Sequence, residues 1–109
     1  MKRKSIIPRE QANQDVDDVV AYYLKEATET VAFGFIDALE QAYGHIGRHP
    51  ATGSLRYAHE LNLFGLRAWS LTRYPYLVFY VERSDHIEIW RVLHSQRDIP
   101  AWMQESDGV

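Results

Sequence analysis

Residues 66–93 read LRAWSLTRYPYLVFYVERSDHIEIWRVL, and this stretch decides the fold class. It contains three runs rich in aromatic and β-branched residues, 66–72, 76–82 and 87–93, a composition typical of β-strands. Ser84-Asp85 separates the last two runs and is a candidate hairpin turn. The stretch therefore predicts three consecutive antiparallel strands.

Upstream of the strands, the hydrophobic period lengthens from two residues to three or four, which indicates helices. The first apolar stripe consists of Ala12, Val16, Val19, Val20, Tyr23, Leu24 and Ala27. The second consists of Val31, Phe35, Ala38, Leu39, Ala42 and Ile46. Thr28 or Thr30 can cap the second helix, which should end before Pro50. The short link between the two stripes predicts a helical hairpin.

The remaining segments complete the layout. Residues 4–8 are predicted as a short strand or extended arm, and residues 50–65 as a loop. Asp98 can cap a last helical turn, and residues 104–109 are expected to be a frayed tail. The order is β-α-α-β-β-β, which predicts an α+β fold with a helical hairpin packed on a small, mainly antiparallel sheet. We expect one domain spanning residues 1–109.

Composition narrows the function classes. The chain has 109 residues and no cysteine, which excludes disulfides and thiolate metal sites. The net charge is −3 and no basic block stands out, which argues against a general RNA or DNA binder and favours a protein partner. The basic N-terminus is not followed by a signal-peptide core, and no segment is long and apolar enough to span a membrane, so we expect a cytoplasmic protein.

Three motifs in the C-terminal half carry a family resemblance. They are Gly65-Leu66-Arg67-Ala68-Trp69, Tyr74-Pro75-Tyr76-Leu77-Val78-Phe79-Tyr80-Val81-Glu82 and Trp90-Arg91-Val92-Leu93-His94-Ser95-Gln96-Arg97-Asp98-Ile99-Pro100. Together with His49-Pro50-Ala51-Thr52-Gly53, they resemble the ParE toxins of the RelE/ParE superfamily over about residues 12–102. The resemblance implies a type II toxin that inhibits DNA gyrase and is neutralised by a ParD-type antitoxin, without a cofactor. Antitoxin contacts are expected on the helical hairpin and on an open edge of the sheet.

The superfamily also contains RelE-like ribonucleases, which cut messenger RNA on the ribosome. A metal-independent ribonuclease needs a base, cations for the phosphorane and a proton donor. RelE-like enzymes usually have an arginine where this chain has Tyr76, and a tyrosine or histidine where it has Trp102-Met103. Since Arg97 alone keeps a place in that set, we favour a non-enzymatic protein binder, with a ribonuclease using Arg97 and His94 as the alternative. A third interpretation is a toxin-derived chain that has lost toxicity and only binds antitoxin.

Four residues near the end of the last strand are candidates for contact with the target: His94, Arg97, Asp98 and Trp102. His94 could be a proton shuttle or make a local hydrogen bond. Arg97 and Asp98 could form a solvent-facing ion pair or an interface contact. The sequence leaves these alternatives open.

Five residues are predicted to be structural or to lie at an interface: Arg67, Trp69, Tyr80, Trp90 and Arg91. Arg67 could clamp loop carbonyls or a partner carboxylate. Unless a bulge shifts the register, Arg91 is in phase with the apolar residues of its strand, Ile87, Ile89 and Leu93, and we expect it to pair with Asp15 or Asp18. The remaining histidines are spread over a helix end, a loop and a turn, so no zinc site is expected. These histidines are His45, His49, His59 and His86.

Overall fold

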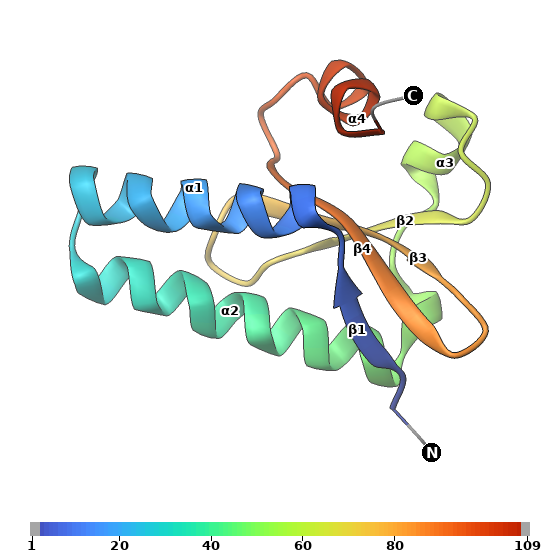
Figure 1. Cartoon of the computed structure of the whole chain (residues 1–109), viewed down its shortest axis with the longest axis horizontal. Helices are drawn as coiled ribbons and strands as arrows, with labels where there is room; N and C mark the ends of the chain where they lie inside the picture. The colour runs from blue at the N-terminus through green and yellow to red at the C-terminus, as the bar shows by residue number, and fades with distance from the viewer. Residues whose placement is uncertain (1–2, 108–109) are drawn as a thin grey trace.

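The computed structural model of the chain describes residues 3–107, and the side chains of residues 3–103. The elements in chain order are β1 (Ser5–Pro8), α1 (Glu10–Glu26), α2 (Glu29–Arg48), the 3-10 turn η1 (Pro50–Thr52), α3 (Arg56–Leu61), β2 (Leu66–Ser70), β3 (Tyr76–Glu82), β4 (His86–His94) and α4 (Ile99–Asp107). Figure 1 shows α1 and α2 side by side as a hairpin over the sheet. The predicted α+β layout is confirmed.

The sheet has four strands in the order β1-β4-β3-β2. Strand β1 pairs in parallel with β4, and the β2–β3 and β3–β4 pairs are antiparallel. The mainly antiparallel sheet is therefore confirmed. The arm predicted at residues 4–8 forms the edge strand β1, which pairs with the first half of β4 and ends just before α1 begins.

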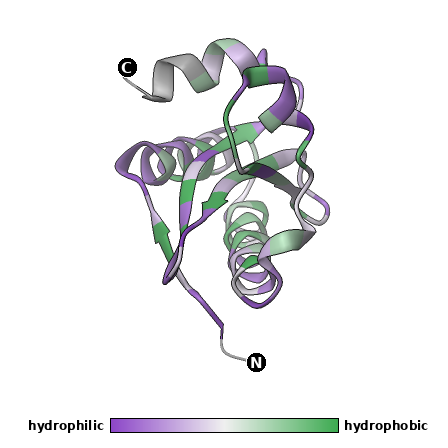
Figure 2. Cartoon of the chain, turned by 90° about the vertical axis from the view of Figure 1, so that its right-hand side faces the viewer, coloured by the Kyte–Doolittle hydropathy of each residue, from purple (hydrophilic) through white to green (hydrophobic). Residues whose placement is uncertain are grey.

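Both faces of the sheet are covered. The larger apolar cluster packs the hairpin helices on one face through residues such as Phe35, Leu39 and Ile89. A second cluster on the other face joins the strands to α3 and α4 through residues such as Phe79 and Ile99. Figure 2 looks along the hairpin helices and shows the strands between α2 and α4. This second layer was not predicted from the sequence.

The boundaries of the hairpin follow local chemistry. The Thr28 hydroxyl accepts a hydrogen bond of 3.2 Å from the Val31 N–H, so it caps the first turn of α2 as predicted. The helix ends at Arg48, two residues before Pro50.

Among the described helices, none is long and apolar enough to cross a bilayer.

Two segments differ from the sequence prediction. Residues 50–65 were predicted as a loop, but they contain η1 and α3. A helix as short as α3 has too few residues for its period to be recognised, and tertiary packing of Tyr57 and Leu61 stabilises it. At the tail expected at residues 104–109, helix α4 continues to Asp107, and residues 108–109 lie outside the described residues.

A β-bulge changes the register of β4. Phe79 pairs with Arg91 whereas its neighbour Tyr80 pairs with Ile89, so Trp90 is an extra residue on β4. Ile89 belongs to the hairpin cluster and Leu93 to the opposite one. Ile89 and Leu93 therefore face opposite sides of the sheet, although their spacing alone predicts the same side. The sequence prediction allowed for this outcome if a bulge shifted the register.

Candidate functional site

A groove of about 610 Å³ lies where α1, the end of β4 and the start of α4 meet. We call it the α1–β4 groove. Its lining residues are Asp15, Asp18, Val19, Tyr22, Tyr23, Tyr76, Val92, Leu93, His94, Arg97 and Trp102. Three of the four predicted target-contact residues, His94, Arg97 and Trp102, therefore come together in one groove.

A buried ion pair between Asp15, which lines the groove, and Arg91 lies next to the groove. The Arg91 guanidinium donates from Nε and Nη2 to the two carboxylate oxygens of Asp15, each at 2.7 Å. Its Nη1 donates to the Trp102 carbonyl at 2.8 Å, which ties α4 to the sheet. Both charged side chains are buried, and the predicted pairing of Arg91 with a first-helix carboxylate is confirmed for Asp15.

Asp15 also completes the edge of the sheet. Strand β1 ends at Pro8, which pairs with Ile89, so β4 loses its neighbour just before the bulge. The Val92 N–H then donates to the Asp15 carboxylate at 3.0 Å. The carboxylate thereby takes the place of the missing strand, which explains why it is buried where β1 gives way to α1.

Arg97 and Trp102 form a cationic aromatic surface at one side of the groove. The Arg97 guanidinium carbon lies 4.2 Å from the centroid of the Trp102 ring, within the range of a cation–π contact. Asp98 accepts from the Ala101 N–H at 3.4 Å through its side chain, so it caps the start of α4. Within the described residues, Arg97 has no carboxylate partner, so the ion pair considered for Arg97 and Asp98 is not formed.

His94 makes the local hydrogen bond that the sequence offered as one alternative. Its Nδ1 accepts from the Gln96 N–H at 3.0 Å, which places the proton of the neutral ring on Nε2. The ring packs edge-on against Tyr76, with centroids 5.1 Å apart. His94 is therefore held in a fixed orientation at the end of β4.

Three tyrosines that were not among the candidates add aromatic surface to the groove. Tyr22 is 57% exposed, whereas Tyr23 and Tyr76 are partly or fully buried. Burial raises the pKa of Tyr23 to about 12, and both the electrostatic interaction and the hydrogen bond with Tyr76 add to this increase. Burial also raises the pKa of Tyr76, although Tyr23 and Arg97 oppose it. Both phenols stay protonated at neutral pH and do not supply a base. One sequence feature could have indicated these tyrosines. Tyr23 belongs to the apolar stripe of the first helix, so its neighbour Tyr22 is a large aromatic residue outside that stripe.

Comparisons with known proteins give the family and the fold of the chain. A protein family described as the ParE toxin of the type II toxin-antitoxin system, parDE, matches residues 6–99. The chain belongs to the ParE toxin family. A solved structure described as the chromosomal ParDE TA system from P. aeruginosa superposes with a TM-score of 0.71 at 16% identity, covering 84% of this chain and 96% of that one. At that identity, the likeness shows the fold alone. A comparison with curated protein sequences gives no match.

As a ParE toxin, the chain is the toxin component of a type II toxin-antitoxin system. The family match includes His94, Arg97 and Asp98 and ends at Ile99, so Trp102 lies beyond it. The family match therefore does not cover Trp102, the residue of α4 that lines the α1–β4 groove.

Arg67 and Tyr80 lie away from the groove and hold the η1 segment of this ParE toxin. Arg67 Nη1 donates to the Gly53 carbonyl at 2.8 Å, which is the loop clamp considered from the sequence. The buried Tyr80 hydroxyl donates to the Pro50 carbonyl at 2.7 Å and accepts from the Gly53 N–H at 3.0 Å. A Cβ at Gly53 would collide with Tyr80 and Arg67, so only glycine fits this contact.

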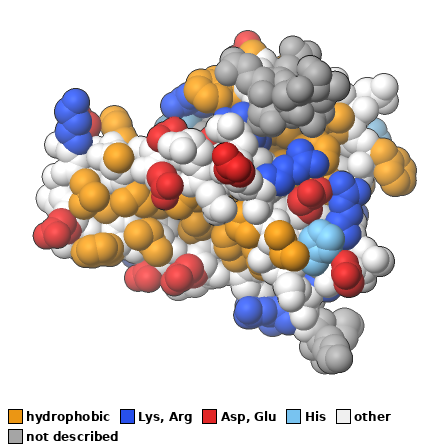
Figure 3. All heavy atoms as spheres, viewed as in Figure 1, with side chains coloured by type: hydrophobic (Ala, Val, Ile, Leu, Met, Phe, Trp, Pro, Cys, Tyr) orange, Lys and Arg blue, Asp and Glu red, His pale blue; other side chains and the backbone are white. Residues whose placement is uncertain are grey.

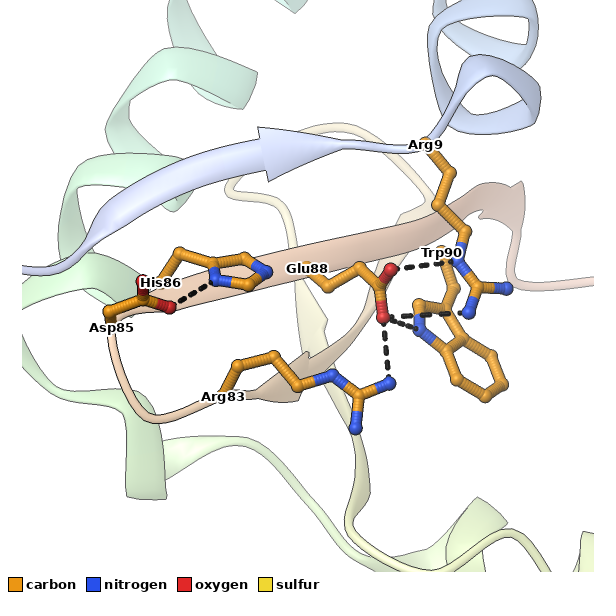
Figure 4. A network of polar contacts seen from close by, with 6 residues as sticks. All are labelled: Arg9, Arg83, Asp85, His86, Glu88 and Trp90. Atoms are coloured by element: carbon orange, nitrogen blue, oxygen red, sulfur yellow. Dashed lines mark hydrogen bonds and ion pairs between the residues drawn. The ribbon is translucent and has the colours of Figure 1, made fainter.

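Trp90 belongs to a polar network around Glu88, which Figure 4 shows from close by. Glu88 accepts from Trp90 Nε1 at 3.0 Å and from Arg83 Nη2 at 2.8 Å, and Arg9 lies over the Trp90 ring at 4.1 Å. Burial raises the pKa of Glu88, but hydrogen bonds from Arg83, Trp90 and Arg9 outweigh it and lower the pKa to about 2. The network ties the residues that follow β1 and β3, Arg9 and Arg83, to β4, and gives Trp90 a structural role.

The last predicted structural residue, Trp69, stacks on His45 with ring centroids 4.4 Å apart. His49 follows His45 by four residues, and the centroids of their rings are 5.2 Å apart. The expectation that the histidines are scattered is therefore wrong for this pair. Within residues 3–107, no group of three or more potential metal-ligating side chains comes together.

Proposed function

We propose that this ParE toxin acts in the cytoplasm by binding DNA gyrase, without catalysis of its own, and that a ParD-type antitoxin neutralises it. The observation that carries the proposal is the α1–β4 groove, where Arg97 over Trp102 stands beside protonated tyrosines. This set of side chains is suited to contact with a protein and poorly suited to cleavage of RNA.

The groove lacks the charge that a metal-independent ribonuclease needs. Tyr76 stands where the related nucleases have an arginine, and it remains a neutral phenol. Arg91 is nearby, but its guanidinium is committed to Asp15 and to the Trp102 carbonyl. Arg97 is left as the cation that faces solvent in the groove, and removing one transition-state donor typically costs a factor of about 100–1000 in rate.

The same residues are favourable for a protein interface. Tyrosine, tryptophan and arginine are enriched among residues that dominate binding energy. The exposed ring of Tyr22, the partly buried ring of Trp102 and the exposed Arg97 side chain all line this groove. We assign target contact to His94, Arg97 and Trp102, and we assign Asp98 the role of orienting α4 through its cap.

The helical hairpin is the better surface for the antitoxin. Figure 3 shows hydrophobic side chains along α1 and α2 between acidic groups, and Tyr22, Leu24 and Phe33 are at least half exposed. The sheet edges offer less, because Ser54 already pairs with Ala68 on the β2 side and Pro8 has no N–H to offer on β1. We therefore place an antitoxin helix on the hairpin and not a strand on the sheet.

The test is a gyrase cleavage assay with purified toxin, with and without its antitoxin. We expect inhibition of supercoiling and accumulation of broken DNA, both suppressed by the antitoxin. An Arg97→Ala, Trp102→Ala double variant should lose the effect, whereas Arg56→Ala, which removes an exposed arginine outside the groove, should keep it. If gyrase keeps its full supercoiling activity over a wide range of toxin concentrations, gyrase is rejected as the target.

A ribosome-based RNA cleavage assay separates the alternatives. Discrete cuts in messenger RNA that disappear with Arg97→Ala would show that the chain is an enzyme. If neither assay responds but the antitoxin still binds, the chain is an antitoxin-binding protein without toxicity.

A further inference from the structure

A second groove, of about 580 Å³, runs along the outer face of the C-terminal half of α2 beside the end of β2. We call it the α2 groove. Its lining residues are Arg3, Asp37, Ala38, Glu40, Gln41, Ala42, Gly44, His45, Arg48, Trp69, Ser70 and Thr72. It shares no lining residue with the α1–β4 groove, so the two surfaces are separate.

Two guanidinium groups converge at one end of the α2 groove. A Cβ placed on Gly44 would lie 3.4 Å from Nη1 of Arg48 and 3.9 Å from Nη1 of Arg3, so the bare glycine backbone gives both groups room. Neither arginine is paired with a carboxylate of residues 3–103. Both arginines are exposed, and two like charges close together without a counter-charge repel each other, so an anion between them would be stabilised.

Further hydrogen-bonding groups around the same groove are unused. His45 Nε2 is buried without a hydrogen-bond partner among the described residues, and such atoms are uncommon in folded proteins. The His45 ring stacks almost parallel on Trp69, with an interplanar angle of 18°. The hydroxyl-bearing side chains of Ser70 and Thr72 line the groove next to this stack. Ser70 and Thr72 therefore offer polar surface, and Trp69 offers aromatic surface, to a ligand in the groove.

The opposite end of the groove is acidic. Asp37, Glu40, Gly44 and Arg48 are spaced by three or four residues and so follow one face of α2. At a rise of 1.5 Å per residue, Asp37 and Arg48 stand about 16 Å apart along the helix. Nucleic acid is disfavoured, because a continuous row of phosphates would run past Asp37 and Glu40. A peptide segment of mixed charge matches both ends.

We propose that the α2 groove binds a segment of a protein partner that places a carboxylate between Arg3 and Arg48 and a lysine or arginine about 10–16 Å away, opposite Asp37 and Glu40. The aromatic stack of Trp69 and His45 contacts the middle of the segment. Binding there leaves the α1–β4 groove open. The proposal depends neither on gyrase nor on the identity of the antitoxin.

The test uses the isotopically labelled chain and short synthetic peptides, followed by NMR. The first peptide carries one glutamate and one lysine separated by three residues. In the second peptide glutamine replaces the glutamate, and a single-stranded oligonucleotide is the third probe. We expect the first peptide to shift the Arg3 and Arg48 side-chain N–H signals and the Trp69 indole N–H signal, and to bind at least tenfold more tightly than the second.

Variants locate the site. Arg3→Gln with Arg48→Gln should weaken the first peptide at least tenfold, while Arg56→Gln, an exposed arginine outside the groove, should leave it unchanged. Unchanged affinity in the double variant, equal binding of the two peptides, or shifts of these signals by the oligonucleotide alone would overturn the proposal.

Discussion

The carboxylate of Asp15 and the guanidinium of Arg91 meet through two hydrogen bonds of 2.7 Å across 76 residues of sequence, with both side chains almost completely buried. The pair joins α1 to the bulge of β4, and the same carboxylate receives the Val92 N–H. It therefore connects the hairpin, the sheet edge and, through Arg91, α4.

Replacing Asp15 with alanine should destabilise the chain by about 3–5 kcal/mol, because the Arg91 charge would remain buried without a partner. Urea unfolding measures the loss. Asp17→Ala, on the exposed side of the same helix, is the matched control and should change stability by less than about 0.5 kcal/mol. A double-mutant cycle tests the coupling. The Asp15→Leu, Arg91→Met double variant should lose less stability than the sum of the losses in the Asp15→Leu and Arg91→Met single variants. Additive losses would contradict the proposed coupling.

Tyr80→Phe should lower stability by about 1–3 kcal/mol. The change removes only an oxygen, but it leaves the Pro50 carbonyl and the Gly53 N–H without their partner. Chemical denaturation of the variant checks the magnitude, with Tyr22→Phe as the control because that ring is mostly exposed. Equal stability of the two variants would mean that the η1 segment contributes little.

How far the sequence predicts this fold depends on the length of the elements. The stripes ending at Ala27 and Ile46 and the aromatic runs of β3 and β4 are long enough for their periods to identify them. Helix α3 is too short for that, and the bulge at Trp90 has no local signature, since Trp90 is one extra residue in an apolar run. Prediction fails here because tertiary packing decides the conformation.

The candidate site was predicted in part for a related reason. His94 and Arg97 lie within the family motif that ends at Pro100, and Trp102 follows that motif by two residues. Tyr22 reaches the same groove from α1, and that proximity depends on how the helix crosses the sheet. The convergence of Arg3 and Arg48 likewise requires the N-terminal arm to return to the end of α2, which no sequence pattern shows.

The Glu88 network predicts a defined dependence of stability on pH. The folded pKa of about 2 lies below the ordinary value of 4.5, so the ionised carboxylate contributes stability that is fully present above about pH 4.5 and is lost as the pH falls toward 2. Glu88→Gln should therefore show a smaller loss of stability over this range than the parent chain. Glu60→Gln, in an exposed pair on α3, should follow the parent curve. A carboxyl signal of Glu88 titrating near its ordinary pKa would contradict the network's strength.

Tyr22 should matter for binding and not for folding. Its side chain is 57% exposed in the α1–β4 groove, so Tyr22→Ala should change the unfolding free energy by less than about 0.5 kcal/mol. If the groove contacts gyrase, loss of an aromatic anchor should weaken inhibition about tenfold or more. Phe64→Ala removes an even more exposed ring outside the groove and is the control. A toxin concentration series in the supercoiling assay measures both variants. Full activity of Tyr22→Ala, or an equal loss with Phe64→Ala, would move the contact surface away from this groove.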